Sequence, residues 1–133
     1  MKGEELVERI LALHSDIRYC AVYRDGQLFK RSKPNLGNSE SSDESDKYEE
    51  LFVNPTLLTL AHQRGELDCG GTRWLLVRYG NFFQWMARIA AGHLSVAIEA
   101  KPNVVDVVAR LEEMMANKAG ALAEYASVPS NTR

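Results

Sequence analysis

The segment RYGNFFQW, residues 78–85, constrains the fold more than any other stretch of the chain. Two apolar runs meet at Gly80-Asn81, and Gly at the first central position of a two-residue loop is typical of a type II′ hairpin turn. The resulting pairs are Tyr79 with Phe82, Arg78 with Phe83, and Leu76 with Trp85. Both faces are then apolar, with Trp74, Leu76, Phe83 and Trp85 on one and Leu75, Val77, Tyr79, Phe82 and Met86 on the other. Because a small antiparallel hairpin usually leaves one face in water, this hairpin predicts helices over both faces of its sheet.

A second turn signal, Asp25-Gly26, lies between segments rich in β-branched and aromatic residues. It predicts a hairpin whose strands cover about residues 17–24 and 27–32. Three more strands are expected at about residues 72–79, 82–90 and 93–99, the last two joined at Ala91-Gly92.

Apolar residues recur at helical spacing near the start of the chain and again after the last strand. These patterns predict a first helix over about residues 3–14 and a last helix over about 104–117. Asn103 stands where the N-cap of the last helix is expected, and Asp106 follows in its first turn.

A third helical pattern occupies the middle of the chain. Asp46 and Glu49 resemble a capping box, while Asn54-Pro55 interrupts the pattern because proline damages a helix interior. We expect either two helices, at about residues 46–53 and 55–64, or one kinked helix that ends near Gly65.

The order of elements is therefore helix, two strands, helix, three strands, helix. It predicts an α+β fold in which a five-stranded antiparallel sheet is sandwiched between the central helix on one face and the N- and C-terminal helices on the other. We expect a single domain over residues 1–119, a flexible acidic loop at residues 32–46, and a frayed tail at residues 120–133.

This order, the Asp25-Gly26 hairpin and the closing segment VVARLEEMM resemble the Roadblock/dynein light chain family over about residues 3–117. The resemblance implies a dimerising scaffold or regulator, often working with Ras-like small GTPases, whose third strand lies at the sheet edge. Profilin-like, longin and PAS-type sensor domains share related arrangements of helices and strands. Similarity of fold is by itself only an associational reason to expect a function.

Composition excludes some classes of function. The net charge of −2 gives no electrostatic reason to expect nucleic-acid binding, which demands a concentrated basic face. Neither a signal peptide nor an apolar run long enough to cross a membrane is present, so we expect a cytoplasmic protein. Cys20 and Cys69 have no CxxC spacing and are expected to be reduced, and buried or half-buried.

No motif predicts catalysis, a metal or a cofactor. His14, His62 and His93 have no zinc-ligand spacing. Cys69 in LDCGGT has two interpretations: a nucleophile with a histidine base, or, as we favour, a small residue in a tight turn. The acidic pairs Glu49-Glu50 and Glu112-Glu113 are interpreted as solvated helix faces.

We therefore expect a non-enzymatic homodimeric adaptor or regulator of a partner protein, with a small-molecule sensor as the alternative. The third strand, TRWLLVRY, is long and apolar with no Pro, Lys or Gly to blunt it, so we expect it to pair with a second copy. The expected interface residues are Leu57, Leu58, Arg73, Trp74, Leu75, Leu76, Val77 and Arg78.

Overall fold

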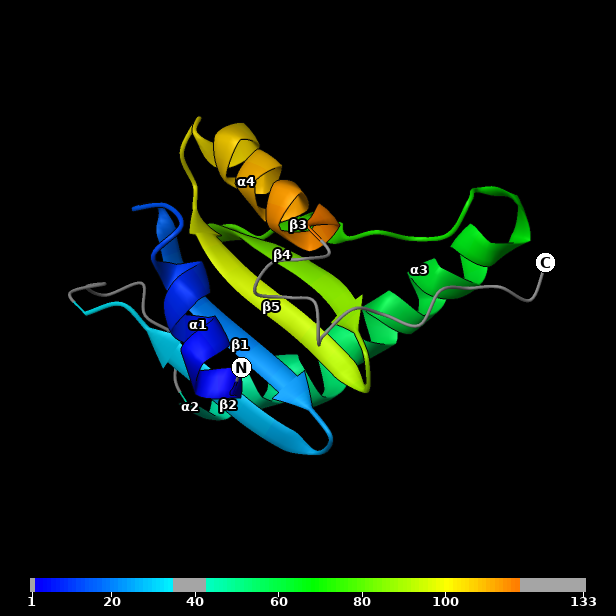
Figure 1. The fold of residues 1–133 in the computed structure, drawn as a ribbon, viewed down its shortest axis with the longest axis horizontal. Helices are drawn as coiled ribbons and strands as arrows, with labels where there is room; N and C mark the ends of the chain where they lie inside the picture. The colour runs from blue at the N-terminus through cyan, green and yellow to red at the C-terminus, as the bar shows by residue number, and fades with distance from the viewer. Residues whose placement is uncertain (1, 35–42, 118–133) are drawn as a thin grey trace.

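A computed structural model describes residues 2–34 and 43–117 of the chain and contains one five-stranded sheet (Figure 1). The strands run in the order β2-β1-β5-β4-β3, and each neighbouring pair is antiparallel. Their bounds are Ile17–Arg24 (β1), Gln27–Ser32 (β2), Leu75–Arg78 (β3), Phe82–Ile89 (β4) and Gly92–Glu99 (β5). β2 and β3 are therefore the two edge strands.

Helices cover both faces of this sheet. Helices α1 (Gly3–Leu11) and α4 (Val104–Ala116) pack on one face. The opposite face lies under one continuous helical run made of α2 (Asp43–Tyr48), the π-helical segment η2 (Glu49–Val53) and α3 (Asn54–Asp68). This arrangement confirms the predicted α+β fold, with the central helix on one face and the terminal helices on the other.

The main hydrophobic core lies between the sheet and helices α1 and α4. Trp85, Leu6 and Ile10 are fully buried there, and Leu111 closes the core from α4. Alternation along the strands produces this layer, since Leu94, Val96 and Ile98 point to it from β5 while the residues between them point to the other face.

Both predicted hairpins form. Asp25 and Gly26 have φ values of 52° and 79°, as a type I′ turn requires. At the second hairpin the predicted pairs are confirmed, and the Tyr79 N–H donates to the Phe82 carbonyl at 2.9 Å. The predicted type II′ turn is wrong, because Gly80 does not have the positive φ that this turn needs. The Arg78 guanidinium instead donates to the carbonyls of Tyr79 and Gly80.

The central helix passes through Pro55 without a break. Proline lacks an N–H and its ring crowds the carbonyl four residues earlier. The turn before it is widened, and the Asn54 N–H donates to the Glu49 carbonyl, five residues back, as in a π-helix. Of the two alternatives that we expected, the structure has a single helical run, and it ends at Asp68. The predicted capping box is wrong, because Asp46 lies inside α2 and its carboxylate accepts from Lys30.

Several predicted boundaries shift by a few residues. The first helix ends at Leu11, where the Ala12 N–H donates to the Glu8 carbonyl. The third strand is shorter than predicted, since it begins at Leu75. Asn103 precedes α4 as expected, but its side chain makes no capping hydrogen bond.

The expected flexible loop and tail are mostly outside the described residues. Residues 43–46, which we assigned to the loop, form the first turn of α2. Residues 35–42 and the tail at 120–133 lie outside the part of the chain that the structure describes. Within the described part, no helix combines the length and the apolar composition that crossing a membrane requires.

Gly92, the first residue of β5, and Gly80, in the turn between β3 and β4, provide a matched test of this fold. A Cβ at Gly92 would lie 1.7 Å from the Tyr23 carbonyl oxygen, whereas nothing lies within 4 Å of a Cβ at Gly80. We expect Gly92→Ala to lower the free energy of unfolding by at least about 2 kcal/mol, since backbone has to move. Gly80→Ala should be neutral or stabilising by about 0.5 kcal/mol, because φ is not positive there. Urea unfolding of both variants checks this. Marked destabilisation by Gly80→Ala would instead indicate that Gly80 has the positive φ of a type II′ turn.

Candidate functional site

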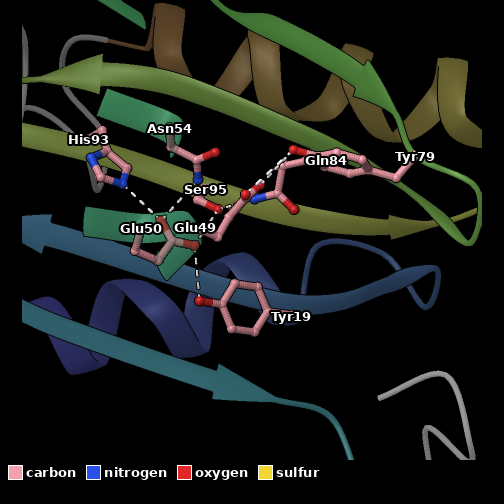
Figure 2. Close-up of polar contacts among 8 residues, drawn as sticks. All are labelled: Tyr19, Glu49, Glu50, Asn54, Tyr79, Gln84, His93 and Ser95. Atoms are coloured by element: carbon pink, nitrogen blue, oxygen red, sulfur yellow. Dashed lines mark hydrogen bonds and ion pairs between the residues drawn. The ribbon is translucent and has the colours of Figure 1, made fainter. Parts of the chain in front are cut away.

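Polar side chains are buried between the sheet and the central helix (Figure 2). Glu50 and Asn54 come from the helix, four residues apart, and both point toward the sheet. The strands contribute the remaining members of this buried network, which are Tyr19 from β1, Gln84 from β4, and His93 and Ser95 from β5.

The Glu50 carboxylate is the centre of the network. Its side chain has no exposed surface, and its Oε1 lies 2.8 Å from His93 Nε2 and accepts from Asn54 Nδ2 at 3.1 Å. Its Oε2 accepts from the Ser95 hydroxyl at 2.8 Å and from the Tyr19 hydroxyl at 3.0 Å. A carboxylate removed from water is costly unless each oxygen is hydrogen-bonded, and here each oxygen has two partners.

Strand alternation brings the partners of Glu50 together. His93 and Ser95 occupy alternate positions of β5, and the register places Ser95 beside Ala21 and Met86 on neighbouring strands. The Gln84 amide donates to the Ser95 hydroxyl oxygen and extends the network onto β4. The face of the sheet below the central helix is therefore polar at its middle, with only a small apolar cluster of Tyr19, Ala21 and Ala97.

The interpretation of Glu49-Glu50 as a solvated face is wrong. Glu50 is fully buried and Glu49 is half-buried. A signal for this did exist in the sequence, because Gln84, His93 and Ser95 alternate with large apolar residues on strands expected to be covered on both faces. Polar residues on a covered face need polar partners, and the helix above them had to supply these.

Two members of the network are almost completely removed from solvent: Ser95 has no exposed surface and His93 is 3% exposed. Burial, and then the charge of Glu50, raise the pKa of Tyr19 far above its ordinary value, which keeps this phenol protonated. The arrangement ties the central helix to three strands.

A cavity of about 470 Å³ opens beside this network, between the helix and one end of the sheet. Tyr19, Glu50 and Gln84 of the network contribute to its wall. The other lining residues are Arg18, Ser32, Ser45, Asp46, Tyr48, Glu49, Val53, Tyr79, Gly80, Asn81, Phe82 and Ala97. Its volume falls within the range of small-molecule pockets, about 300–1,000 Å³.

Glu49 projects from the helix toward the turn that follows β3. The Tyr79 hydroxyl donates to Glu49 Oε1 at 3.1 Å, as Figure 2 shows. Burial raises the pKa of the Glu49 carboxyl; the Tyr79 hydrogen bond opposes this shift, and the charges of Glu50 and Asp46 add to it. Burial, and then the charge of Glu49, raise the pKa of Tyr79 to about 12.

The residues expected at an interface lie in different environments. Leu58 is 3% exposed and Leu57 is half-buried, so Leu58 is a core residue of this chain. Arg73 and Trp74 both donate to the carboxylate of Glu112 on α4. Leu75 and Val77 are half-buried, while Leu76 and Arg78 are exposed on β3, an edge strand.

The residues considered for chemistry are scattered. Cys20 is buried as expected, but Cys69 is exposed at the end of α3, because the chain turns there through Gly70 and Gly71 at φ values of 79° and 90°. His14 accepts from the Asp16 N–H at 2.9 Å, far in sequence from His93 in the network. Among residues 2–34 and 43–117, no group of three or more His, Cys, Asp or Glu side chains is placed to hold a metal ion.

Replacing the central carboxylate tests how much the network stabilises the fold. Glu50→Gln puts an amide where four donors converge, so we expect it to lower the free energy of unfolding by about 3 kcal/mol. Glu113→Gln, on the exposed side of α4, is the matched control and should change it by less than about 0.5 kcal/mol. Equal stability of the two variants in urea unfolding would contradict the central role of Glu50.

Alkaline pH tests the Tyr19 hydrogen bond. The raised pKa of Tyr19 means that its proton stabilises the folded state fully below pH 10, the ordinary tyrosine value. Above that pH the unfolded chain loses the proton and the folded chain keeps it, so stability falls. We expect the wild type to lose about 1 kcal/mol more than Tyr19→Phe between pH 10 and 11. Parallel losses in urea unfolding of the two proteins would mean that Tyr19 ionises freely.

Comparison with known proteins does not assign the chain. No family model matches the sequence, and no curated protein matches it. The resemblance to the Roadblock/dynein light chain family therefore stays a prediction from the order of elements. What the protein does has to be argued from its own residues, above all from the edge strand, the central helix and the cavity.

Proposed function

We propose that the protein is a non-enzymatic homodimeric adaptor or regulator of a partner protein, and that it acts in the cytoplasm. Two observations carry the proposal: β3 lies at the edge of the sheet among the described residues, and the central helix is rich in exposed apolar side chains. Two free cysteines, Cys20 and Cys69, fit the reducing conditions of a cytoplasmic protein.

The edge strand β3 offers main-chain groups for pairing. The Tyr79 N–H bonds to β4, and antiparallel ladders alternate, so the N–H groups of Val77 and Leu75 also face β4. Those of Leu76 and Arg78 consequently face away from the sheet. A second copy of β3 running antiparallel satisfies these groups across a twofold axis, as a closed dimer requires.

The central helix supplies an apolar surface for such contacts. Among the described residues, five of the seven large hydrophobic side chains that are exposed belong to the α2–α3 helical run. They are Tyr48, Leu51, Phe52, Leu60 and Leu67. The last turns of α3 extend past the sheet, and Leu67 is 75% exposed there (Figure 1). Concentrated apolar exposure of this kind is typical of protein–protein contact sites.

The resemblance to the Roadblock/dynein light chain family suggests a Ras-like small GTPase as the partner. Of the chain's own features, the exposed helix surface supports a protein partner in general and no particular class of partner. Affinity capture with the tagged chain from its native host, followed by mass spectrometry, identifies the partner; enrichment of a small GTPase would support this suggestion, and its absence among stoichiometric partners would reject it.

The alternative, a small-molecule sensor, is favoured by one specific observation. The sensor hypothesis expects a pocket between the sheet and the central helix, and the cavity of about 470 Å³ lies there. The cavity and the apolar helix surface share Tyr48, but β3 contributes no residue to the cavity, so substitutions in β3 separate dimerisation from ligand binding.

Proline substitutions in β3 test the dimer. We expect the wild type to scatter light with about twice the 14.9 kDa chain mass at micromolar concentrations. Leu76→Pro removes an outward N–H and leaves the β3–β4 ladder intact, so it should give a folded monomer. Leu75→Pro is the matched control: it removes a donor to β4 and should lower the thermal midpoint instead.

The outcomes of this test are distinct. A wild type that stays monomeric at these concentrations rejects the homodimer. A folded Leu76→Pro protein that remains dimeric rejects pairing through β3. If Leu76→Pro does not fold, Leu76→Lys, which blunts the edge with a charge, provides the same readout.

A further inference from the structure

The cavity between the central helix and the sheet has an uneven charge balance. Three carboxylates line it, from Asp46, Glu49 and Glu50, against one guanidinium, that of Arg18. Arg18 already lies 3.5 Å from the Glu99 carboxylate, outside the cavity wall. The wall therefore carries more negative charge than its own cation offsets.

Of the three carboxylates, only Glu49 lacks a basic partner. Asp46 lies 3.4 Å from the Lys30 ammonium, and Glu50 lies 2.8 Å from the His93 ring. Among the described residues, no Lys, Arg or His side chain forms an ion pair with Glu49, which instead accepts from the neutral Tyr79 hydroxyl. Burial raises the pKa of this carboxyl, and the Tyr79 hydrogen bond and the charge of His93 offset only part of that shift.

Aromatic rings surround the same space. Phe82 and Tyr79 lie with their ring centroids 5.3 Å apart, and both line the cavity near Glu49. The Arg18 guanidinium already makes a cation–π contact with the Phe82 ring, 5.4 Å from its centroid. Rings beside a carboxylate form the usual binding site for ammonium groups, which both attract.

We propose that this cavity binds a small organic cation, an amine or quaternary ammonium group on an apolar body, with its charge at Glu49 and its body against Tyr79, Phe82 and Val53. The carboxylate supplies the charge, the rings supply cation–π attraction, and the apolar wall covers the rest of the ligand. Pairing through β3 leaves this site in place, because no residue of β3 contributes to it.

Three probes with one phenylpropyl body test the charge preference: 3-phenylpropylammonium, the neutral 3-phenylpropanol and the anionic 3-phenylpropionate. In a ¹H–¹⁵N NMR titration at fixed ionic strength, we expect the ammonium to bind about tenfold more tightly than the alcohol. The propionate should not bind. Shifted amides should lie in residues 79–82 and 49–53. Equal affinity for the ammonium and the alcohol, or shifts confined to other residues, overturns the proposal.

Matched variants locate the charge. Glu49→Gln should weaken binding of the ammonium about tenfold and leave binding of the alcohol unchanged. Glu113→Gln removes a carboxylate on the opposite side of the sheet and should change neither affinity. Tyr79→Phe keeps the ring and removes the donor to Glu49, so ammonium affinity should be kept or increased. A folded Glu49→Gln protein with wild-type affinity for the ammonium overturns the proposal even if the cavity binds the probe.

Discussion

The buried carboxylate of Glu50 determines how the central helix fits on the sheet. A charged group without exposed surface is tolerated only because Tyr19, Asn54, His93 and Ser95 converge on its two oxygens. Apolar packing between a helix and a sheet leaves rotation and sliding weakly specified, whereas directed hydrogen bonds specify one arrangement. The polar network thus sets the position of the central helix, and with it the cavity and the exposed apolar surface.

One helical run serves three purposes because its turns differ in environment. The turns around Glu50 and Asn54 face the sheet, Glu49 faces the cavity, and Leu67 near the end is exposed to solvent. The π-helical segment before Pro55 allows this continuity, since the wider turn accommodates a residue without an N–H. A break at Pro55 would have separated the side chains that bind the sheet from those offered to a partner.

The strands and the two hairpins at Asp25-Gly26 and Gly80-Asn81 were predictable from sequence, because strand alternation and turn residues are local signals. The register at Tyr79 and Phe82 follows from the turn length alone, and Asp25-Gly26 has few alternatives to a type I′ turn. The burial of Glu50 was missed because an acidic residue on a helix is usually solvated, and its strand partners come from two distant strands, β1 and β5. The size and lining of the cavity could not be predicted either, since they depend on how far the helix stands from the sheet.

Two hydrogen bonds connect the end of α3 to the segment that leads into the edge strand β3. The Thr72 hydroxyl donates to the Ala61 carbonyl at 2.9 Å, and the Gly71 N–H donates to the Gly65 carbonyl at 3.0 Å. Gly65 permits this close approach, because a Cβ there would lie 2.4 Å from the Thr72 hydroxyl oxygen. Anything that displaces the projecting turns of α3 must either break these hydrogen bonds or carry the start of β3 along, so the helix and the sheet edge respond mechanically as one piece.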